Sequence, residues 1–97
     1  MGVSDDKNIY HLSEQVLAVQ TNGEYVLMDY GSGKFFGIRG AAQVLVQPLQ
    51  AGMTFNAMVD LVQRHYGVDA ILAETDVRKI LSRLLDAGLV VDGGAPL

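Results

Sequence analysis

The chain has 97 residues, a formal net charge of −4 and an apolar fraction of 49%, and it contains no cysteine. This length accommodates one hydrophobic core, and the apolar fraction is typical of a packed domain. The acidic balance argues against a nucleic-acid surface, and the missing cysteines exclude disulfides, zinc–thiolate sites and thiol catalysis. No apolar run approaches the ~20 residues that span a bilayer, and the first residues are polar, so we expect a cytoplasmic protein without a membrane partner.

The first third of the chain predicts three antiparallel strands. Residues 15–21 form a plausible first strand, and the Asn22-Gly23 pair after it is a strong hairpin signal. Two apolar runs, 25–28 and 35–38, flank a turn over 29–34 with two glycines, which predicts a second hairpin. The last of these strands lies at an edge of the sheet. Its unpaired N–H and C=O groups must be covered, aggregate or bind another strand.

A short first helix is predicted over residues 41–50, with its apolar face formed by Ala42, Leu45, Val46 and Leu49. Pro48 should kink this helix or end it near residue 47, because proline inside a helix removes a hydrogen bond and costs ~3 kcal/mol.

Two longer helices should follow. Thr54 and Asp69 are suited to cap their first turns, and Gly88 suits the left-handed position after the last one. Leu89 can fold back on that last turn, and residues 89–91 are candidates for a short extended piece. The predicted buried faces are Phe55, Met58, Val59, Val62 and Tyr66 on the second helix, and Val77, Ile80, Leu81, Leu84 and Leu85 on the third.

The two ends of the chain should be loose, at residues 1–8 and 93–97. We therefore predict a single domain over residues 1–97, with its core at about 9–92 and flexible tails. The segment 9–12 has no clear assignment and is a candidate for packing against the sheet.

The sequence offers few candidates for catalysis. His11 and His65 lie far apart and lack metal-ligand spacing, and no serine has an adjacent base. The run Gly31-Ser32-Gly33-Lys34 is similar to part of a phosphate loop, but it joins two strands instead of opening a helix. We therefore expect a protein that is not an enzyme and holds no metal or cofactor.

Several short motifs occur in a specific order between about residues 16 and 91. They are Val26-Leu27-Met28-Asp29, Ser32-Gly33-Lys34-Phe35-Phe36-Gly37-Ile38, Gly52-Met53-Thr54, Tyr66-Gly67-Val68-Asp69, Asp76-Val77 and Gly88-Leu89. No single piece is diagnostic, but in this order and spacing the chain resembles the PqqD-like family. Pro48 departs from the family pattern, where a helix former is usual, and leaves the shape of the first helix open.

The resemblance implies a small recognition domain of ribosomal peptide biosynthesis. Its fold would be α+β and similar to a winged helix-turn-helix, with a three-stranded antiparallel sheet followed by three helices. Members bind the leader region of a precursor peptide and hand the peptide to a modifying enzyme, in pyrroloquinoline quinone and lasso-peptide pathways among others. The implied partners are a precursor-peptide leader and either a transglutaminase-like leader peptidase, which we favour, or a radical SAM enzyme.

The resemblance also implies where the leader binds. It would add as a fourth strand beside residues 34–38, with the third helix as the other wall of a groove. Cationic groups would meet acidic leader residues, and apolar ones would meet apolar residues, although a solvated helix face remains the alternative for each charge. Strand alternation directs one of Phe35 and Phe36 toward the helices, and the sequence leaves open which one. The predicted peptide-binding residues are Lys34, Phe35, Phe36, Gly37, Ile38, Asp76, Lys79, Ile80, Arg83 and Leu84.

A winged-helix DNA-binding regulator is the second interpretation, because its fold is similar. Such a protein needs a basic recognition helix. The predicted third helix carries as many acidic as basic residues, and this balance argues against a DNA-binding role. The acidic residues are Glu74, Asp76 and Asp86, and the basic residues are Arg78, Lys79 and Arg83. A small catalytic subunit is the third interpretation, and no residues favour it.

Overall fold

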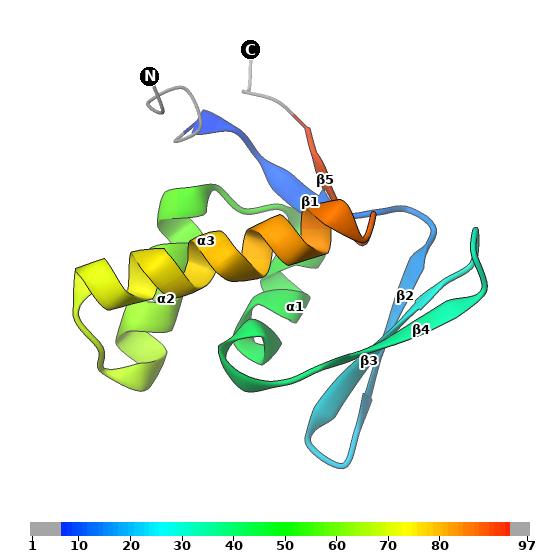
Figure 1. Ribbon diagram of the computed structural model, residues 1–97, viewed down its shortest axis with the longest axis horizontal. Coiled ribbons are helices and arrows are strands. Elements are labelled where there is room, and N and C mark those ends of the chain that lie inside the picture. The colour runs from blue at the N-terminus through cyan, green and yellow to red at the C-terminus, as the bar shows by residue number, and fades with distance from the viewer. Residues whose placement is uncertain (1–6, 94–97) are drawn as a thin grey trace.

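The computed structural model describes residues 7–93 and confirms the predicted α+β fold (Figure 1). No helix within these residues is both long enough and apolar enough to cross a membrane. The elements in chain order are β1 (Tyr10–Leu12), β2 (Val16–Thr21), β3 (Glu24–Asp29), β4 (Lys34–Ile38), the 3₁₀ helix η2 (Gly40–Ala42), α1 (Gln43–Ala51), α2 (Phe55–Tyr66), α3 (Ala70–Asp86) and β5 (Val90–Asp92).

Strands β2, β3 and β4 form an antiparallel sheet in that order, as predicted. Asn22 and Gly23 join β2 to β3 with φ values of 46° and 82°, which is the left-handed geometry that an Asn-Gly hairpin turn requires. In the second turn, the Asp29 carboxylate accepts hydrogen bonds from the Gly31 N–H at 2.9 Å and the Ser32 hydroxyl at 3.2 Å. These turns set a register in which every residue of β3 pairs with β2, and residues 25–29 also pair with β4.

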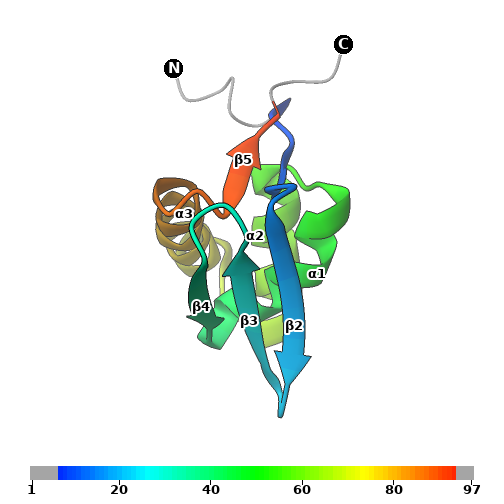
Figure 2. The same cartoon turned by 90° about the vertical axis from the view of Figure 1, so that its right-hand side faces the viewer.

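All three helices lie on one face of this sheet, and no helix within residues 7–93 covers the other face (Figure 2). The inner face contributes the buried Leu27 and Ile38 to a core that the helices complete. The most fully buried side chains of that core are Leu27, Leu45, Leu49, Met58, Leu89, Val62, Val77 and Val90.

Helix α1 continues through Pro48 to Ala51, so the predicted early end near residue 47 is wrong. Leu45, Val46 and Leu49 are all buried, and Leu49, directly after the proline, is only 1% exposed. Burying a leucine contributes about 1.5–3 kcal/mol. Packing of this last turn against the core therefore offsets the hydrogen bond that proline cannot donate.

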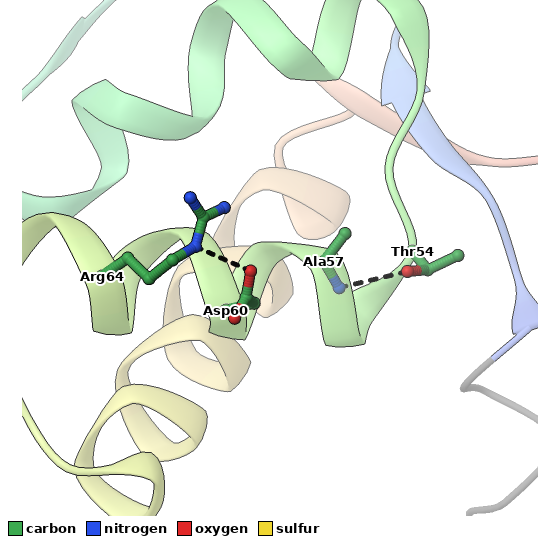
Figure 3. A network of polar contacts seen from close by, with 4 residues as sticks. All are labelled: Thr54, Ala57, Asp60 and Arg64. Carbon is green, nitrogen blue, oxygen red and sulfur yellow. Dashed lines mark hydrogen bonds and ion pairs between the residues drawn. The ribbon is translucent and has the colours of Figure 1, made fainter.

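Helices α2 and α3 begin at the predicted caps. The Thr54 hydroxyl accepts a hydrogen bond from the Ala57 N–H at 3.1 Å, one turn before the Asp60–Arg64 ion pair (Figure 3). On α3, the Asp69 carboxylate accepts from the Leu72 N–H at 2.8 Å.

The predicted buried faces of α2 and α3 are present, with some members only partly covered. On α2, Phe55, Met58 and Val62 are buried, but the Tyr66 side chain is exposed and donates from its hydroxyl to the carbonyl oxygen of Gly40. Tyr66 is thus the wrong member of the predicted α2 face, because it lies at the end of the helix, beyond the core. On α3, Val77, Leu81 and Leu84 are buried, while Ile80 and Leu85 are half-buried.

Helix α3 ends in the predicted left-handed glycine. Gly88 has a φ of 74°, and its N–H donates to the carbonyl oxygen of Leu85. The Leu89 N–H donates to the carbonyl oxygen of Leu84, and its side chain is buried. This pair of hydrogen bonds is the Schellman arrangement, which turns the chain back over the last turn of α3.

The two ends of the described chain meet in a second, two-stranded sheet. Strand β1 pairs antiparallel with β5, and Tyr10 also exchanges two backbone hydrogen bonds with Met53, both at 2.8 Å. The segment 9–12 therefore pairs with residues 90–92, and its Tyr10 and Leu12 side chains join the same core cluster as Leu27 and Ile38 of the three-stranded sheet. The predicted loose tails fall largely on residues 1–6 and 94–97, which lie outside the described residues.

Candidate functional site

Strand β4 lies at an edge of the three-stranded sheet, so one of its two sides has no partner strand within residues 7–93. Its side chains alternate. Phe36 lies opposite the buried Leu27 and is half-buried against the core, whereas Phe35 lies opposite Met28 and is 68% exposed. The side chain that faces the helices is therefore Phe36, and Phe35 lies on the outer face of the sheet.

A groove of about 490 Å³ lies between β4 and α3. This volume falls in the range of ~300–1,000 Å³ that is common for ligand pockets. One wall is the edge strand and the other is the last half of α3, and residues of the adjoining segments also line the groove. The lining residues are Phe36, Gly37, Ile38, Arg39, Ala42, Ile80, Arg83, Leu84, Ala87 and Leu89.

The α3 wall follows from helical spacing. Ile80, Leu84 and Ala87 are separated by four and three residues, so they share one face of the helix. The neighbouring face, through Val77 and Leu81, is buried in the core and fixes the rotation of α3. An apolar stripe is thereby presented to the groove.

Cationic side chains gather beside the groove. A second hollow of about 450 Å³ on α3 is lined by Thr75, Arg78, Lys79, Ser82 and Arg83, and Arg83 lines both hollows. Arg78 already has partners within the fold. It forms an ion pair with Glu74 at 3.6 Å, and its guanidinium carbon lies 4.9 Å from the centre of the Phe55 ring. Within residues 7–93, Lys79 and Arg83 form no ion pair, so their charges are open to a partner.

The structure brings six of the ten predicted peptide-binding residues into the groove, namely Phe36, Gly37, Ile38, Ile80, Arg83 and Leu84. The other four lie elsewhere. Lys79 lines the neighbouring hollow, and Lys34 is exposed at the start of β4. Phe35 lies on the outer face of the sheet, and Asp76 is half-buried on α3 and lines neither hollow.

Four lining residues were not among those predicted: Arg39, Ala42, Ala87 and Leu89. Helical spacing from Ile80 and Leu84 could have identified Ala87. The positions of Arg39 and Ala42 depend on the path of the chain through η2, for which the sequence carries no clear signal.

The site combines an open strand edge and apolar walls with two arginines among its lining residues, and such groups can bind a ligand. Among the described residues, no three His, Cys, Asp or Glu side chains lie close enough together to hold a metal ion.

Two solved structures resemble this chain. The first, described as TbiB1 in complex with the TbiA(beta) leader peptide, is 27% identical with a TM-score of 0.78, over 89% of this chain and 99% of that one. The second is a lasso peptide synthetase B1 complexed with the leader peptide. It is 25% identical with a TM-score of 0.70, over 84% of this chain and 96% of that one. No curated protein matches the sequence.

A family model also matches the chain. Its description is coenzyme PQQ synthesis protein D (PqqD), and the match covers residues 24–90, which is more than half of the sequence. This range begins at β3 and ends at the first residue of β5, so it contains both walls of the groove. The chain therefore belongs to the PqqD family.

Proposed function

We propose that this protein binds the leader region of a ribosomally synthesised precursor peptide and delivers the peptide to a modifying or proteolytic enzyme. The observation that carries this proposal is an open strand edge that lies beside an apolar groove. Membership of the PqqD family supports it, and so do the two similar structures, whose descriptions both name a leader peptide.

The leader adds as a fourth strand beside β4. Main-chain hydrogen bonds to the free edge supply affinity that tolerates many sequences, and pockets for alternate side chains supply selectivity. Side chains on one face of the added strand enter the groove toward Phe36, Ile80 and Leu84. Those on the other face lie beside Phe35 and Gly37.

Acidic residues in the leader complement the rim of the groove. Arg39 and Arg83 both line the groove. Lys34 lies at the start of β4, and Lys79 lines the neighbouring hollow on α3. Arg39 pairs with Glu24 at 3.6 Å, whereas Lys34, Lys79 and Arg83 form no ion pair within residues 7–93, so these three place positive charge near the groove of a protein whose formal net charge is −4. A local field of this kind favours encounter with a peptide that carries Asp or Glu.

The delivered peptide goes to a separate enzyme, because the groove offers binding groups rather than a catalytic arrangement. Both similar structures are leader complexes, and one is named as a component of lasso peptide synthesis. We therefore favour a transglutaminase-like leader peptidase over a radical SAM enzyme as the partner. A DNA-binding role receives no such support, since α3 carries as many acidic as basic side chains.

The test titrates the protein with fluorescent peptides that correspond to the N-terminal regions of the short reading frames beside its gene. Saturable binding of one peptide, and not of a scrambled peptide of the same composition, is the expected result. A DNA duplex serves as the competing ligand. Salt-dependent binding of the duplex without binding of any peptide would replace the proposal with the regulator interpretation.

A further inference from the structure

A second hollow lies along the outer face of α3, beside the groove that we assign to the leader. Its volume is about 450 Å³, and its lining residues all belong to this one helix: Thr75, Arg78, Lys79, Ser82 and Arg83. From one helical turn to the next, these positions are spaced by three or four residues, so they form one stripe, which we call the outer stripe. All five residues are exposed, so the outer stripe is open to a partner.

The outer stripe faces away from the groove. Ser82 is two residues from both Ile80 and Leu84, which line the groove. At about 100° per residue, Ser82 lies about 160° around the helix from each of them. Arg83 is placed between the two faces and lines both hollows. A partner of the outer stripe can therefore bind α3 while a leader strand occupies the groove on its other side.

The outer stripe is cationic in an acidic protein. It holds three of the seven Lys and Arg residues of a chain whose formal net charge is −4. Lys79 and Arg83 form no ion pair within residues 7–93. Arg78 pairs with Glu74 at 3.6 Å, but both side chains are more than half exposed, so this pair is weak and an external carboxylate can replace Glu74. Asp86, one turn after Ser82, does not line the hollow.

Two exposed apolar side chains lie at the start of the outer stripe. Ile71 and Leu72 precede Thr75 by four and three residues, so they share its side of the helix, and they are 79% and 47% exposed. Among residues 7–93, no other large apolar side chain is as exposed as Ile71. Protein interfaces combine apolar contacts with charges that select the partner. The stripe and its apolar start therefore suit a protein surface better than a nucleic acid, whose phosphates are repelled by a net charge of −4.

We propose that the outer stripe docks the enzyme that receives the peptide, through an acidic segment of that enzyme with an apolar residue at one end. This inference rests on the proposed function, which requires such an enzyme. Carboxylates of the segment pair with Arg78, Lys79 and Arg83. The Ser82 hydroxyl, which lies among these cations, donates to the same segment, and the apolar residue covers Ile71. Helix α3 then holds the leader on one side and the enzyme on the other.

The experiment measures two affinities for each variant. The peptide-modifying or leader-cleaving enzyme encoded beside this gene is immobilised and titrated with the protein, and a fluorescent leader peptide is titrated in solution. Ser82→Glu puts a carboxylate in the middle of the outer stripe, on the side of α3 that is opposite to the groove. We expect this variant to bind the enzyme about tenfold more weakly or worse, which corresponds to about 1.4 kcal/mol, and to keep the wild-type affinity for the leader. Higher salt should also weaken enzyme binding, because it screens exposed charges.

Two further variants make the assignment specific. Asn56→Glu is the matched control, because it adds the same single negative charge at an exposed position on α2, and it should change neither affinity. Ile71→Ser tests the apolar start of the stripe without a change of charge, and it should weaken enzyme binding but not leader binding. All three variants should melt close to the wild-type temperature, since each replaces an exposed side chain.

The two affinities distinguish failure of the docking surface from failure of the proposed function. Equal enzyme affinities for the wild type and Ser82→Glu, or a wild type that binds the leader but not the enzyme, would overturn the docking surface and leave leader binding intact. A parallel loss of both affinities in Ser82→Glu would show that the stripe belongs to the leader site. A wild-type dimer that Ser82→Glu dissociates, or displacement of the enzyme by a DNA duplex, would also overturn the assignment. Failure of every leader peptide to bind would overturn the proposed function itself.

Discussion

Reversal of the charge at Arg83 tests the electrostatic half of leader binding. Arg83 lines both hollows on α3 and, within residues 7–93, forms no ion pair. A leader carboxylate ~4 Å from its guanidinium would gain up to ~4 kcal/mol at an effective dielectric constant of ~20. Arg83 is exposed, however, and measured exposed ion pairs contribute only about 0–1 kcal/mol. Arg83→Glu removes this attraction and adds a repulsion of similar size.

We therefore expect Arg83→Glu to weaken leader binding about tenfold or more, which corresponds to about 1.4 kcal/mol. Its melting temperature should stay close to that of the wild type, since no internal contact of the charge is lost. Calorimetric titration of the leader at two salt concentrations measures both effects. Higher salt should weaken binding to the wild type, because exposed charges are screened over ~10 Å at 0.1 M and ~3 Å at 1 M.

Arg64→Glu is the matched control. It makes the same change in formal net charge, from −4 to −6, but Arg64 lies on α2, where it pairs with Asp60 at 2.8 Å. This variant should lose a little stability and keep most of its leader affinity. Equal affinities for wild type and Arg83→Glu at both salt concentrations would refute the electrostatic reasoning and leave a groove that binds through its backbone edge and apolar walls.

Three further predictions concern the fold and the strand edge. Leu81→Ala should cost about 2–5 kcal/mol because the side chain is only 7% exposed, whereas exposed Ser82→Ala should leave the denaturation midpoint nearly unchanged. Thr54→Ala removes the α2 cap and should cost ~1 kcal/mol in thermal unfolding. Of Phe36→Pro and Gly37→Pro, one should weaken leader binding with the fold intact and the other should damage the fold, because their N–H groups point to opposite sides of β4. Full-strength binding by two variants with native circular dichroism would exclude strand addition.

The parts of the fold that the sequence predicted are those set by local chemistry. The Asn22-Gly23 turn, the caps at Thr54 and Asp69 and the glycine at Gly88 each involve hydrogen bonds or dihedral angles within a few residues. The pairing of β1 with β5 could not be predicted, because it joins three residues at one end of the chain to three at the other. Neither segment carries enough pattern to identify a partner so far away.

The site residues also divide into those that a local pattern predicts and those whose positions depend on the tertiary fold. Alternation along β4 predicted that Phe35 and Phe36 face opposite ways, but the choice between them depends on which face of the sheet the helices cover. That is a property of the tertiary fold. The position of Arg39 in the groove lining likewise depends on how the chain turns into η2, and no periodic pattern in the sequence predicts that turn.

Two residues break a local rule in this sequence, and the difference between them is informative. Pro48 interrupts a helix, and the fold itself compensates, because the turn that contains it buries Leu49 against the core. Gly37 weakens a strand, and within the described residues no contact, turn or close approach compensates. Residues that break a local structural preference without a compensating contact in the fold are expected at functional sites. Gly37 lies on the free edge beside the groove, so the compensating contact is best sought in the peptide that binds there.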